Sequence, residues 1–358
     1  MVGAIPFVKL VFPGFFDQVA NHDLNSFAND FPLVARIIDR GEMIDNRQFS
    51  IERDLLGAFD LTTHSENLTV TALTAAADGI EYSPGMMRAD PVHVRADGAQ
   101  LRLFCGEGFE PSAAQSKLLI EELARLFPEA KFICGRHPAR WYIQLAQTFD
   151  FSTPAPAEIN QRAIEGHLPS GKDAPQLHVL LNEIQMALYQ SEVNNKRERD
   201  GLAPINSIWF WGTRPLVAEG ASANFALWGN DVLGYALAER SGAMFYEQPN
   251  ITEVIGATVP NHLGRLVLFN SPNGPLTKRG ADINLEKFEQ VWAPSLLRKL
   301  RLGGIQQLEI IDLRRRLMIS RLDIWKIWRR SSYFKDKLTV HIDPSKISQD
   351  VSANDTSD

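Results

Sequence analysis

Residues 181–212, LNEIQMALYQSEVNNKRERDGLAPINSIWFWG, carry the pattern that decides the fold. Apolar residues recur at helical spacing from just before this stretch, at Leu177, Leu181, Ile184 and Leu188. This spacing predicts an amphipathic helix. The apolar run from Ile205 to Trp211, closed by Gly212, predicts a strand buried on both faces. A helix followed by a buried strand is typical of α/β proteins, in which helices cover a mostly parallel sheet.

The same alternation continues outward from this stretch. We expect strands at 7–12, 131–134, 266–270 and 308–311, helices at 31–38, 55–61, 112–126, 231–240 and 285–302, and a hairpin at 91–104 around Asp97-Gly98. Ligands of doubly wound sheets bind beyond the carboxyl ends of the strands. The loops after Trp211 and Asn270 are therefore the first places to look for a site.

The length of 358 residues is enough for about two domains. Residues 151–175 contain four prolines and two glycines with little periodicity, which is typical of a crossing between domains. We expect an N-terminal part of the core at 1–88, a smaller inserted α/β domain at 89–170, the main α/β core at 171–341 and a disordered acidic tail at 342–358.

Composition excludes several classes of protein. The net charge of −6 argues against a nucleic-acid or membrane binder that uses its whole surface, although a local basic patch remains compatible with it. Cys105 and Cys134 are too few for a disulfide framework or a thiolate metal site, and no run of 18 apolar residues predicts a membrane span. We expect a cytoplasmic protein without a membrane partner, for which nucleic acid is an improbable partner.

Two groups of motifs indicate a family. The segment Ser191–Arg197, followed by Gly201 and by Pro204–Gly212, resembles a pattern of archaeal-type cofactor-independent phosphoglycerate mutases, which belong to the alkaline phosphatase superfamily. Ala89–His93, together with the helix Leu181–Met186 and the Trp-x-Trp-Gly strand end, resembles RpfE-type regulatory proteins of the same ancestry more closely. The resemblance covers roughly residues 88–330 and implies an alkaline-phosphatase-like core with a smaller inserted domain.

The enzymes of this family need two divalent metals held by Asp and His, and a serine nucleophile. Their early Asp-Gly-x-x-Asp motif is matched here only by Pro13–Asp17, no Asp-His dipeptide occurs, and the late strand leads to Asp312-Leu313. The resemblance therefore implies that two-metal phosphotransfer is lost and that no cofactor is bound. The alternative is a site for two Mn or Zn ions, with ligands drawn from Asp17, His22, His64 or His262.

Candidate ligand-binding residues fall in two places. Arg136 and Arg140 flank His137 after a predicted strand and could grip an anion. A pocket at the strand end could be lined by Asn194, Arg197, Asn206, Trp211, Gly212 and Arg214. The alternative for both groups is a structural role, in surface ion pairs or in a crossover loop.

Supporting roles are expected for Asp90, His93 and Glu183. Asp90 and His93 lie three apart on a predicted strand, so their side chains point to opposite faces. Glu183 could orient Arg197 or Asn194. Asn230-Asp231 is expected to cap the following helix, with metal binding as the alternative.

The resemblance and the missing ligands together predict a phosphoglycerate-mutase-like protein that acts as a regulatory or ligand-binding protein for a small phosphorylated or carboxylated metabolite. One alternative is an active phosphoglycerate mutase or phosphohydrolase. Another is a scaffold that binds a protein partner through Arg314–Lys337, which carries nine basic and two acidic residues, and through the acidic tail.

Overall fold

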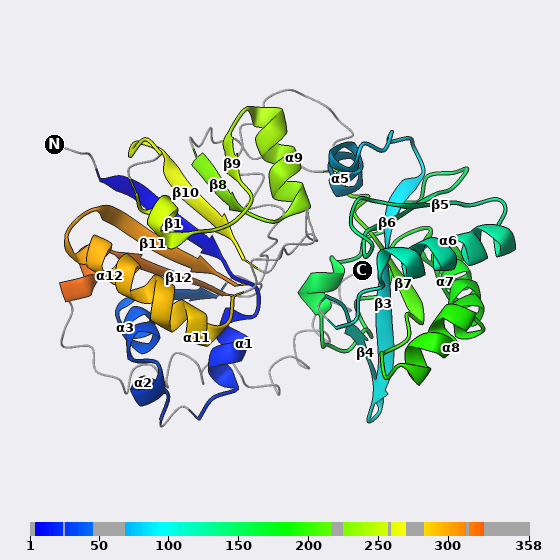
Figure 1. The fold of residues 1–358 in the computed structure, drawn as a ribbon, viewed down its shortest axis with the longest axis horizontal. Helices are drawn as coiled ribbons and strands as arrows, with labels where there is room; N and C mark the ends of the chain where they lie inside the picture. The colour runs from blue at the N-terminus through cyan, green and yellow to red at the C-terminus, as the bar shows by residue number, and fades with distance from the viewer. Residues whose placement is uncertain are drawn as a thin grey trace, which may run out of the picture. The chain divides into compact units, whose positions relative to one another are not determined.

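The computed structural model describes residues 4–23, 26–45, 69–106, 108–215, 225–256, 259–269, 283–312 and 315–325 (Figure 1). The chain divides into two compact units, one formed by 1–49, 249–267 and 283–358, the other by 50–248 and 268–282. Helices and strands alternate in both units, so the predicted mixed α/β class is confirmed. Residues 55–61, His64 and the predicted tail lie outside the described residues.

A seven-stranded, mostly parallel sheet forms the first of two sheets. Its strands, in sheet order, are β2 (Glu42–Asp45), β12 (Arg315–Ser320), β11 (Ile305–Ile311), β1 (Ile5–Val11), β10 (Gly264–Leu268), β8 (Phe225–Gly229) and β9 (Met244–Tyr246). β1 runs parallel to β11, and β8 runs parallel to β9. β12 is antiparallel to both of its neighbours. The strands predicted at 7–12, 266–270 and 308–311 are confirmed as β1, β10 and β11.

The helices that accompany these strands are short. They are α1 (Phe15–Ala20), α2 (Phe27–Asp30), α3 (Pro32–Arg40), α9 (Val232–Ser241), α10 (Ile251–Val254), α11 (Leu285–Lys287), the π-turn η2 (Phe288–Trp292), α12 (Ala293–Arg301) and the 3-10 turn η3 (Asp323–Trp325). α12 buries Leu296, Leu297 and Leu300 on one face and ends before Gly303, which has a left-handed φ of 75°. The helices predicted at 31–38, 231–240 and 285–302 are thus confirmed, the last one as three consecutive segments.

The second sheet has five strands and lies within residues 86–211. Its strands are β3 (Met86–Asp97), β4 (Gln100–Phe104), β5 (Lys131–Cys134), β6 (Trp141–Gln144) and β7 (Ser207–Trp211), and α5 (Val70–Asp78), α6 (Ala113–Leu126), η1 (Pro156–Ile159), α7 (Ala174–Tyr189) and α8 (Glu192–Arg199) accompany them. The predicted hairpin is confirmed as β3 and β4, and the predicted helix at 112–126 begins with the expected Ser112/Gln115 capping box.

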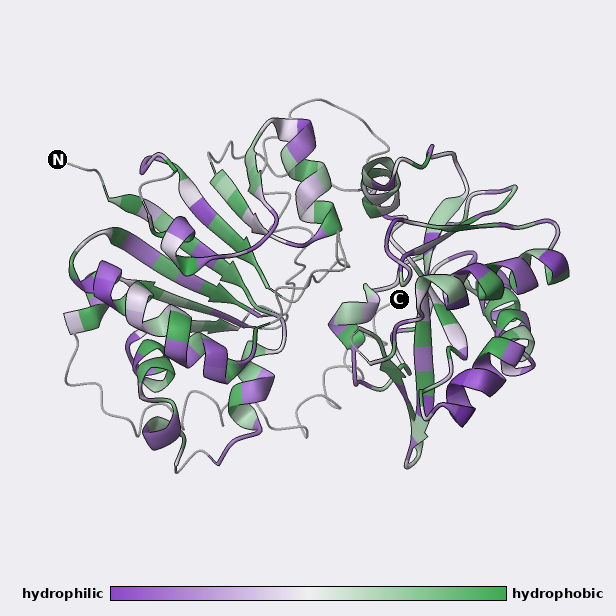
Figure 2. Cartoon of the chain, in the orientation of Figure 1, coloured by the Kyte–Doolittle hydropathy of each residue, from purple (hydrophilic) through white to green (hydrophobic). Residues whose placement is uncertain are grey.

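Apolar faces of α6 and α7 pack against this second sheet. Leu119 and Leu123 from α6, and Leu181 and Ile184 from α7, share one core with strand residues such as Ile208. Figure 2 shows the resulting division of each helix into a hydrophobic and a hydrophilic side. The helical spacing of the leucines therefore predicted correctly which face is buried.

The strand predicted at 205–211 exists, but its place in the fold was predicted wrongly. β7 pairs antiparallel with β3 in the second sheet and does not belong to the mostly parallel sheet. An antiparallel strand covered by helices can be as apolar as a parallel one, so the run Ile205–Trp211 could not distinguish the two. Trp211 consequently ends a strand of the second sheet, whereas β10 is a strand of the first sheet. Asn270, which follows the strand predicted at 266–270, lies outside the described residues.

No helix in the part of the chain that the structure describes is both long and apolar enough to span a bilayer.

Candidate functional site

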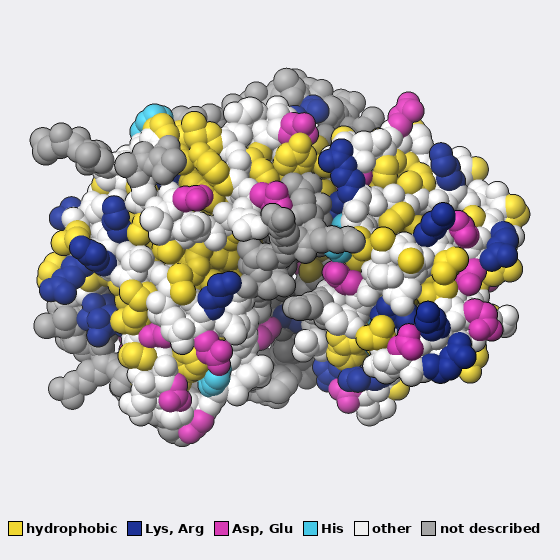
Figure 3. Space-filling model, in the orientation of Figure 1, with side chains coloured by type: hydrophobic (Ala, Val, Ile, Leu, Met, Phe, Trp, Pro, Cys, Tyr) yellow, Lys and Arg dark blue, Asp and Glu magenta, His cyan; other side chains and the backbone are white. Residues whose placement is uncertain are grey.

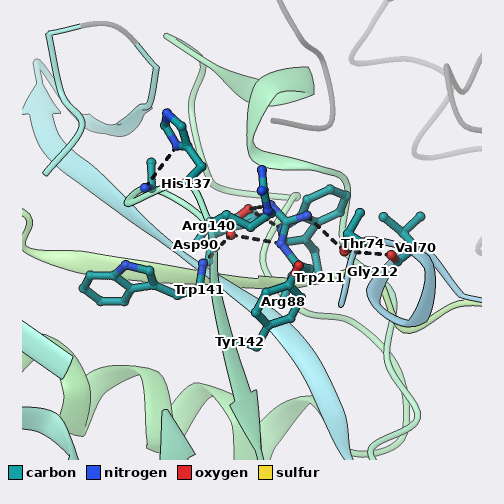
Figure 4. Close-up of polar contacts among 12 residues, drawn as sticks. Val70, Thr74, Arg88, Asp90, His137, Arg140, Trp141, Tyr142, Trp211 and Gly212 are labelled. Atoms are coloured by element: carbon teal, nitrogen blue, oxygen red, sulfur yellow. Dashed lines mark hydrogen bonds and ion pairs between the residues drawn. The ribbon is translucent and has the colours of Figure 1, made fainter. Parts of the chain in front are cut away.

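A group of buried charged and aromatic side chains lies where β3, β6 and β7 meet α5. We call it the buried arginine network, and its members are Thr74, Asp78, Arg88, Asp90, Arg140, Tyr142 and Trp211 (Figure 4). Arg88 and Asp90 are two apart on β3, so their side chains share one face of the sheet. The strand register places Trp211 opposite Arg88 on one side and Tyr142 opposite Arg88 on the other.

Asp90 is the acceptor at the centre of this network. Its carboxylate accepts hydrogen bonds from Arg88 Nε at 3.0 Å and Nη2 at 2.6 Å, from Trp211 Nε1 at 2.8 Å and from the Trp141 amide at 3.2 Å. The Arg88 guanidinium also lies 4.6 Å from the Trp211 ring centre and 5.6 Å from that of Tyr142. The charge of Asp90 is thus matched entirely by groups of the protein itself.

A second buried ion pair joins α5 to the end of β5–β6. Asp78 accepts from Arg140 Nε at 2.7 Å and from Nη2 at 2.6 Å, and Tyr142 Oη donates to it at 2.8 Å. Burial raises the pKa of Asp78, but the hydrogen bonds and charge of Arg140 outweigh it, so the pKa lies below its usual value. For Arg140, burial lowers the pKa while Asp78 raises it, and the net direction is upward.

The two arginines that were predicted to bind an anion around His137 have different environments. Arg140 is buried and paired with Asp78, whereas Arg136 is exposed. His137 is buried, its Nδ1 accepts from the Ala139 amide at 3.2 Å, and its Nε2 lies 3.8 Å from the Glu110 carboxylate. Of the two predicted arginines, only Arg136 therefore presents its side chain to solvent.

Asn194, Arg197 and Asn206, predicted at the end of a strand, lie instead at the start of β7. Asn194 donates to the carbonyls of Leu188 and Ile205 and accepts from the Ile205 amide, each at 2.8 Å. Asn206 donates to the Val94 carbonyl and accepts from the Val94 amide, both at 2.7 Å. These amide side chains bond backbone groups on both sides, so they hold α8 and β3 to the entry of β7.

Arg197 is also buried and bound to protein groups. Its guanidinium donates to the Ala203 carbonyl at 2.8 Å, to Gln115 Oε1 at 2.7 Å and, at longer distance, to the carbonyls of Phe109 and Glu110. Burial lowers its pKa. The expectation that Glu183 orients Arg197 or Asn194 is wrong: Glu183 is exposed on α7, and the two side chains take their hydrogen bonds from other residues.

His93 and Asp90 have different neighbours, as expected for opposite faces of a strand. His93 Nδ1 lies 2.8 Å from the Pro204 carbonyl, and its ring stacks at 5.8 Å on Phe109. Gly212, at the end of β7, has a left-handed φ of 80°, and a Cβ there would lie 2.8 Å from Thr71 Oγ1. Arg214 is exposed and reaches Ser152 Oγ at 3.5 Å.

The predicted site residues therefore form two groups instead of one pocket. Asn206 precedes β7 and Trp211 ends it, and five steps of a strand span about 16 Å. Asp78, Arg88 and Tyr142 were missed by the sequence analysis. Arg88 lies two residues before Asp90, just ahead of the predicted hairpin at 91–104, and extending that strand would have found it. Nothing local pairs Asp78 with Arg140, which follows 62 residues later.

Aromatic rings fill the carboxyl end of β1 in the first unit. The cluster comprises Phe12, Phe15, Phe16 and Phe288, all buried, with ring centres of neighbouring pairs between 5.0 and 5.9 Å apart. Phe12 follows β1 directly, Phe15 and Phe16 open α1, and Phe288 comes from η2. At the end of β1, these rings therefore pack on one another.

Asp312 directly follows β11 beside this cluster. It is the carboxylate that the sequence analysis noted after the late strand. Oδ1 accepts from the Gly14 amide at 2.8 Å, and Oδ2 accepts from the Phe16 amide at 2.9 Å. Both oxygens thus bind the first turn of α1, whose unsatisfied amides and positive end favour a carboxylate. Among the described residues at this end, Asp312 serves as a helix cap and its neighbours are the packed rings.

The structure describes the alternative metal ligands except for His64. Asp17 is exposed on α1, and the His22 ring packs 4.8 Å from Phe31. In the described ranges, no three His, Cys, Asp or Glu side chains come together in a way that could hold a metal. Asp231 accepts from the Gly234 amide at 2.8 Å, which confirms it as the cap of α9.

The sequence matches no defined protein family. One hundred residues are 38% identical to a 2,3-bisphosphoglycerate-independent phosphoglycerate mutase of Methanothrix thermoacetophila, covering 27% of this chain and 24% of that protein. Fifty-seven residues are 39% identical to a probable enzyme of the same name from Geobacter sulfurreducens, covering 16% of this chain and 14% of that protein. This chain has weak homology to phosphoglycerate mutases. The matches span less than a quarter of these mutases.

Two solved structures are similar over most of the chain. The cofactor-independent phosphoglycerate mutase of Thermoplasma acidophilum matches with a TM-score of 0.37 at 13% identity, over 88% of this chain and 89% of that one. The PH0037 protein of Pyrococcus horikoshii matches with a TM-score of 0.42 at 12% identity, over 89% and 88%.

Proposed function

We propose that this chain is a phosphoglycerate-mutase-like protein that has lost two-metal phosphotransfer and acts as a regulatory protein binding a small anionic metabolite. The observation that carries the proposal concerns the carboxyl ends of β1 and β11. In place of a cluster of metal ligands, the described residues there are the packed rings of Phe12, Phe15, Phe16 and Phe288 and the helix-capping Asp312. The sequence homology to mutases supplies the ancestry from which such a loss is inferred.

Two-metal catalysis needs carboxylates and imidazoles around an open position for the phosphoryl group. A metal pair beside Asp312 would have to share its carboxylate oxygens with the Gly14 and Phe16 amides, which already donate to them. The rings packed beside it, Phe12, Phe15, Phe16 and Phe288, offer no ligand atoms for a metal. We therefore infer that the described residues favour a retained fold with a changed role, as in the RpfE-type regulatory proteins whose motifs the sequence resembles.

The candidate contacts for an anionic metabolite are Arg136 and Arg214, since these predicted arginines expose their side chains. They lie at opposite ends of α5. Arg136 lies beside Gly79 after the last turn, and Arg214 follows Gly212, which bonds Thr71 in the first turn. A small metabolite therefore contacts one of them at a time, and Arg140 and Arg197 act as structural supports.

The test is metal analysis of the purified protein, combined with thermal unfolding in the presence of Mn²⁺, Zn²⁺ or 3-phosphoglycerate. A ligand that binds only the native state raises its apparent stability by mass action. We expect no metal-dependent mutase or phosphatase turnover, and a stabilisation by the anion that is reduced in Arg136→Gln or in Arg214→Gln. Arg199→Gln, on the exposed face of α8, is the matched control.

Stoichiometric metal with metal-dependent turnover would overturn the proposal in favour of an active mutase or phosphohydrolase. A protein that is stabilised by neither metal nor anion would overturn the metabolite-binding part and favour the scaffold alternative.

A further inference from the structure

Arginines and exposed apolar side chains gather at the amino end of β11, at the other end of the strand from Asp312. We call this group the cationic tip, and its members are Arg36, Arg40, Arg301, Leu302, Arg321, Leu322 and Trp325. β11 has seven residues, so about 20 Å of strand separates the tip from the Asp312 end. Figure 3 shows Lys and Arg side chains gathered at this end of the first unit, on the left.

Contacts between side chains and backbone connect members of the tip. The Arg301 guanidinium lies 5.5 Å from the Trp325 ring centre, and Arg40 donates to the carbonyl of the preceding residue, Ile324. A Cβ on Gly303 would lie 2.8 Å from Arg321 Cζ, so Arg321 covers the turn that ends α12. The tip is therefore one continuous surface built from α3, the end of α12, the turn after β12 and η3.

The tip carries excess positive charge. Burial is the largest cause that lowers the pKa of Arg40. The positive charges of Arg36 and Arg301 lower it further, and the negative charge of Asp39 raises it. The other nearby acid, Asp323, accepts from Ser320 N at 2.8 Å and Oγ at 2.6 Å. Four arginines of the tip thus face two nearby acids.

The apolar members of the tip protrude from the surface. Leu302 is 70% exposed, Leu322 76% and Trp325 53%. Leu302 and Leu322 lie at the turns that follow α12 and β12, which are neighbours because the Arg321 amide donates to the Gln306 carbonyl near the start of β11. Leucines exposed to this extent do not line a groove, and they can enter a flat apolar layer.

We propose that the cationic tip docks on the surface of an anionic lipid bilayer. Arginines are attracted to the negative headgroups, and leucine and tryptophan side chains bury themselves at the boundary between headgroups and acyl chains. Single-stranded nucleic acid would require several exposed aromatic platforms, whereas the tip has Trp325 and two leucines. The net charge of −6 does not oppose a local contact of this kind, because screening confines charge effects to about 10 Å.

The test is co-sedimentation of the full-length protein with vesicles of phosphatidylcholine alone or of phosphatidylcholine mixed with phosphatidylglycerol. We expect binding to the mixed vesicles only, weakened by added salt. Each of Arg36→Gln, Arg301→Gln and Arg321→Gln should reduce the partition constant about fivefold, which corresponds to about 1 kcal/mol per basic residue near an anionic surface.

The apolar contribution is tested with Leu302→Ser and Leu322→Ser, which should also weaken binding while leaving the circular dichroism spectrum unchanged. Val179→Ser and Met186→Ser on α7, at 58% and 67% exposure, are matched controls expected to bind like the parent protein. Equal binding to both vesicle types, no binding to either, or tighter binding to duplex DNA at the same salt would overturn the proposal. The leucine variants separate bilayer insertion from simple attraction to a polyanion, since serine there leaves the charge unchanged.

Discussion

The Asp78 carboxylate and the Arg140 guanidinium form a two-bond ion pair whose side chains are 0% and 1% exposed. The pair joins the last residue of α5 to the residue before β6. Tyr142 adds a third hydrogen bond to the carboxylate. A buried pair of this kind is costly to break, because the remaining charge has no water to replace its partner.

Asp78→Asn should therefore lower the free energy of unfolding by about 3–5 kcal/mol, since Arg140 would keep its charge without a counter-ion. Urea unfolding at neutral pH measures the change. Asp97→Asn is the control, because Asp97 also pairs with an arginine, Arg102, at 2.6 Å but at the surface. That substitution should cost less than about 1 kcal/mol. Equal losses in the two variants would show that the Asp78–Arg140 pair is not isolated from solvent.

His93 should make stability depend on pH. Burial lowers its pKa below the usual value of 6.5, the nearby Arg95 and Arg197 add to this, and the bond to the Pro204 carbonyl opposes it. The unfolded chain then binds a proton more readily than the native chain, so the contribution of His93 is complete above pH 6.5 and declines as the pH falls toward the native pKa. Urea midpoints compared at about pH 8 and about pH 5 should fall less in His93→Gln than in the parent protein.

The groups that titrate in both proteins cancel in that comparison. An equal fall in the parent protein and the variant would contradict the prediction.

Gly212 should tolerate alanine much less well than Gly201 does. Both residues have left-handed backbones, with φ of 80° and 74°, but a Cβ at Gly212 would lie 2.8 Å from Thr71 Oγ1, while Gly201 has open space. Gly201→Ala isolates the backbone strain, on the order of 1 kcal/mol, and Gly212→Ala adds the cost of displacing Thr71. Thermal unfolding of the two variants gives the difference directly. A loss in Gly212→Ala no larger than that in Gly201→Ala would mean that Thr71 moves aside freely.

Asp312→Ala should remove the cap of α1 and cost about 1–2 kcal/mol of stability, since the Gly14 and Phe16 amides would lose their acceptor. Asp231→Ala, which removes the cap of α9, is the matched control and should cost a similar amount. Chemical denaturation of both variants tests this assignment. If Asp312→Ala also abolished binding of a stoichiometric metal, Asp312 would be a ligand rather than a cap.

Local patterns in the sequence predicted most elements but not their partners. The leucines of α7, the capping box of α6 and the turn at Asp97-Gly98 each depend on residues close in the chain, and all were predicted correctly. The pairing of β7 with β3 joins residues more than 110 positions apart, and an apolar run contains no information about its partner. The class of fold was therefore accessible, and the assignment of strands to the two sheets was not.

The candidate site shows the same limit. Arg140 was identified as a cation after a strand, but its role depends on Asp78, which local sequence marks only as part of a turn. Similarly, Asn194 and Arg197 were grouped with Trp211 because they are close in the sequence, whereas they contact the start of β7 and Trp211 lies at its end. Spacing predicts faces and caps well, and it does not predict which charges neutralise each other.

The Asn206–Val94 contact has a consequence for how the second sheet assembles. Asn206 offers one donor and one acceptor to Val94, as a neighbouring strand would, and it does so at the first position before β7. Sliding β7 by two residues would keep its side chains on the same faces but would lose both bonds, and it would carry Trp211 about 7 Å away from Asp90. Asn206 therefore fixes the register of β7 against β3. It disfavours shifted pairings that hydrophobic burial alone would allow.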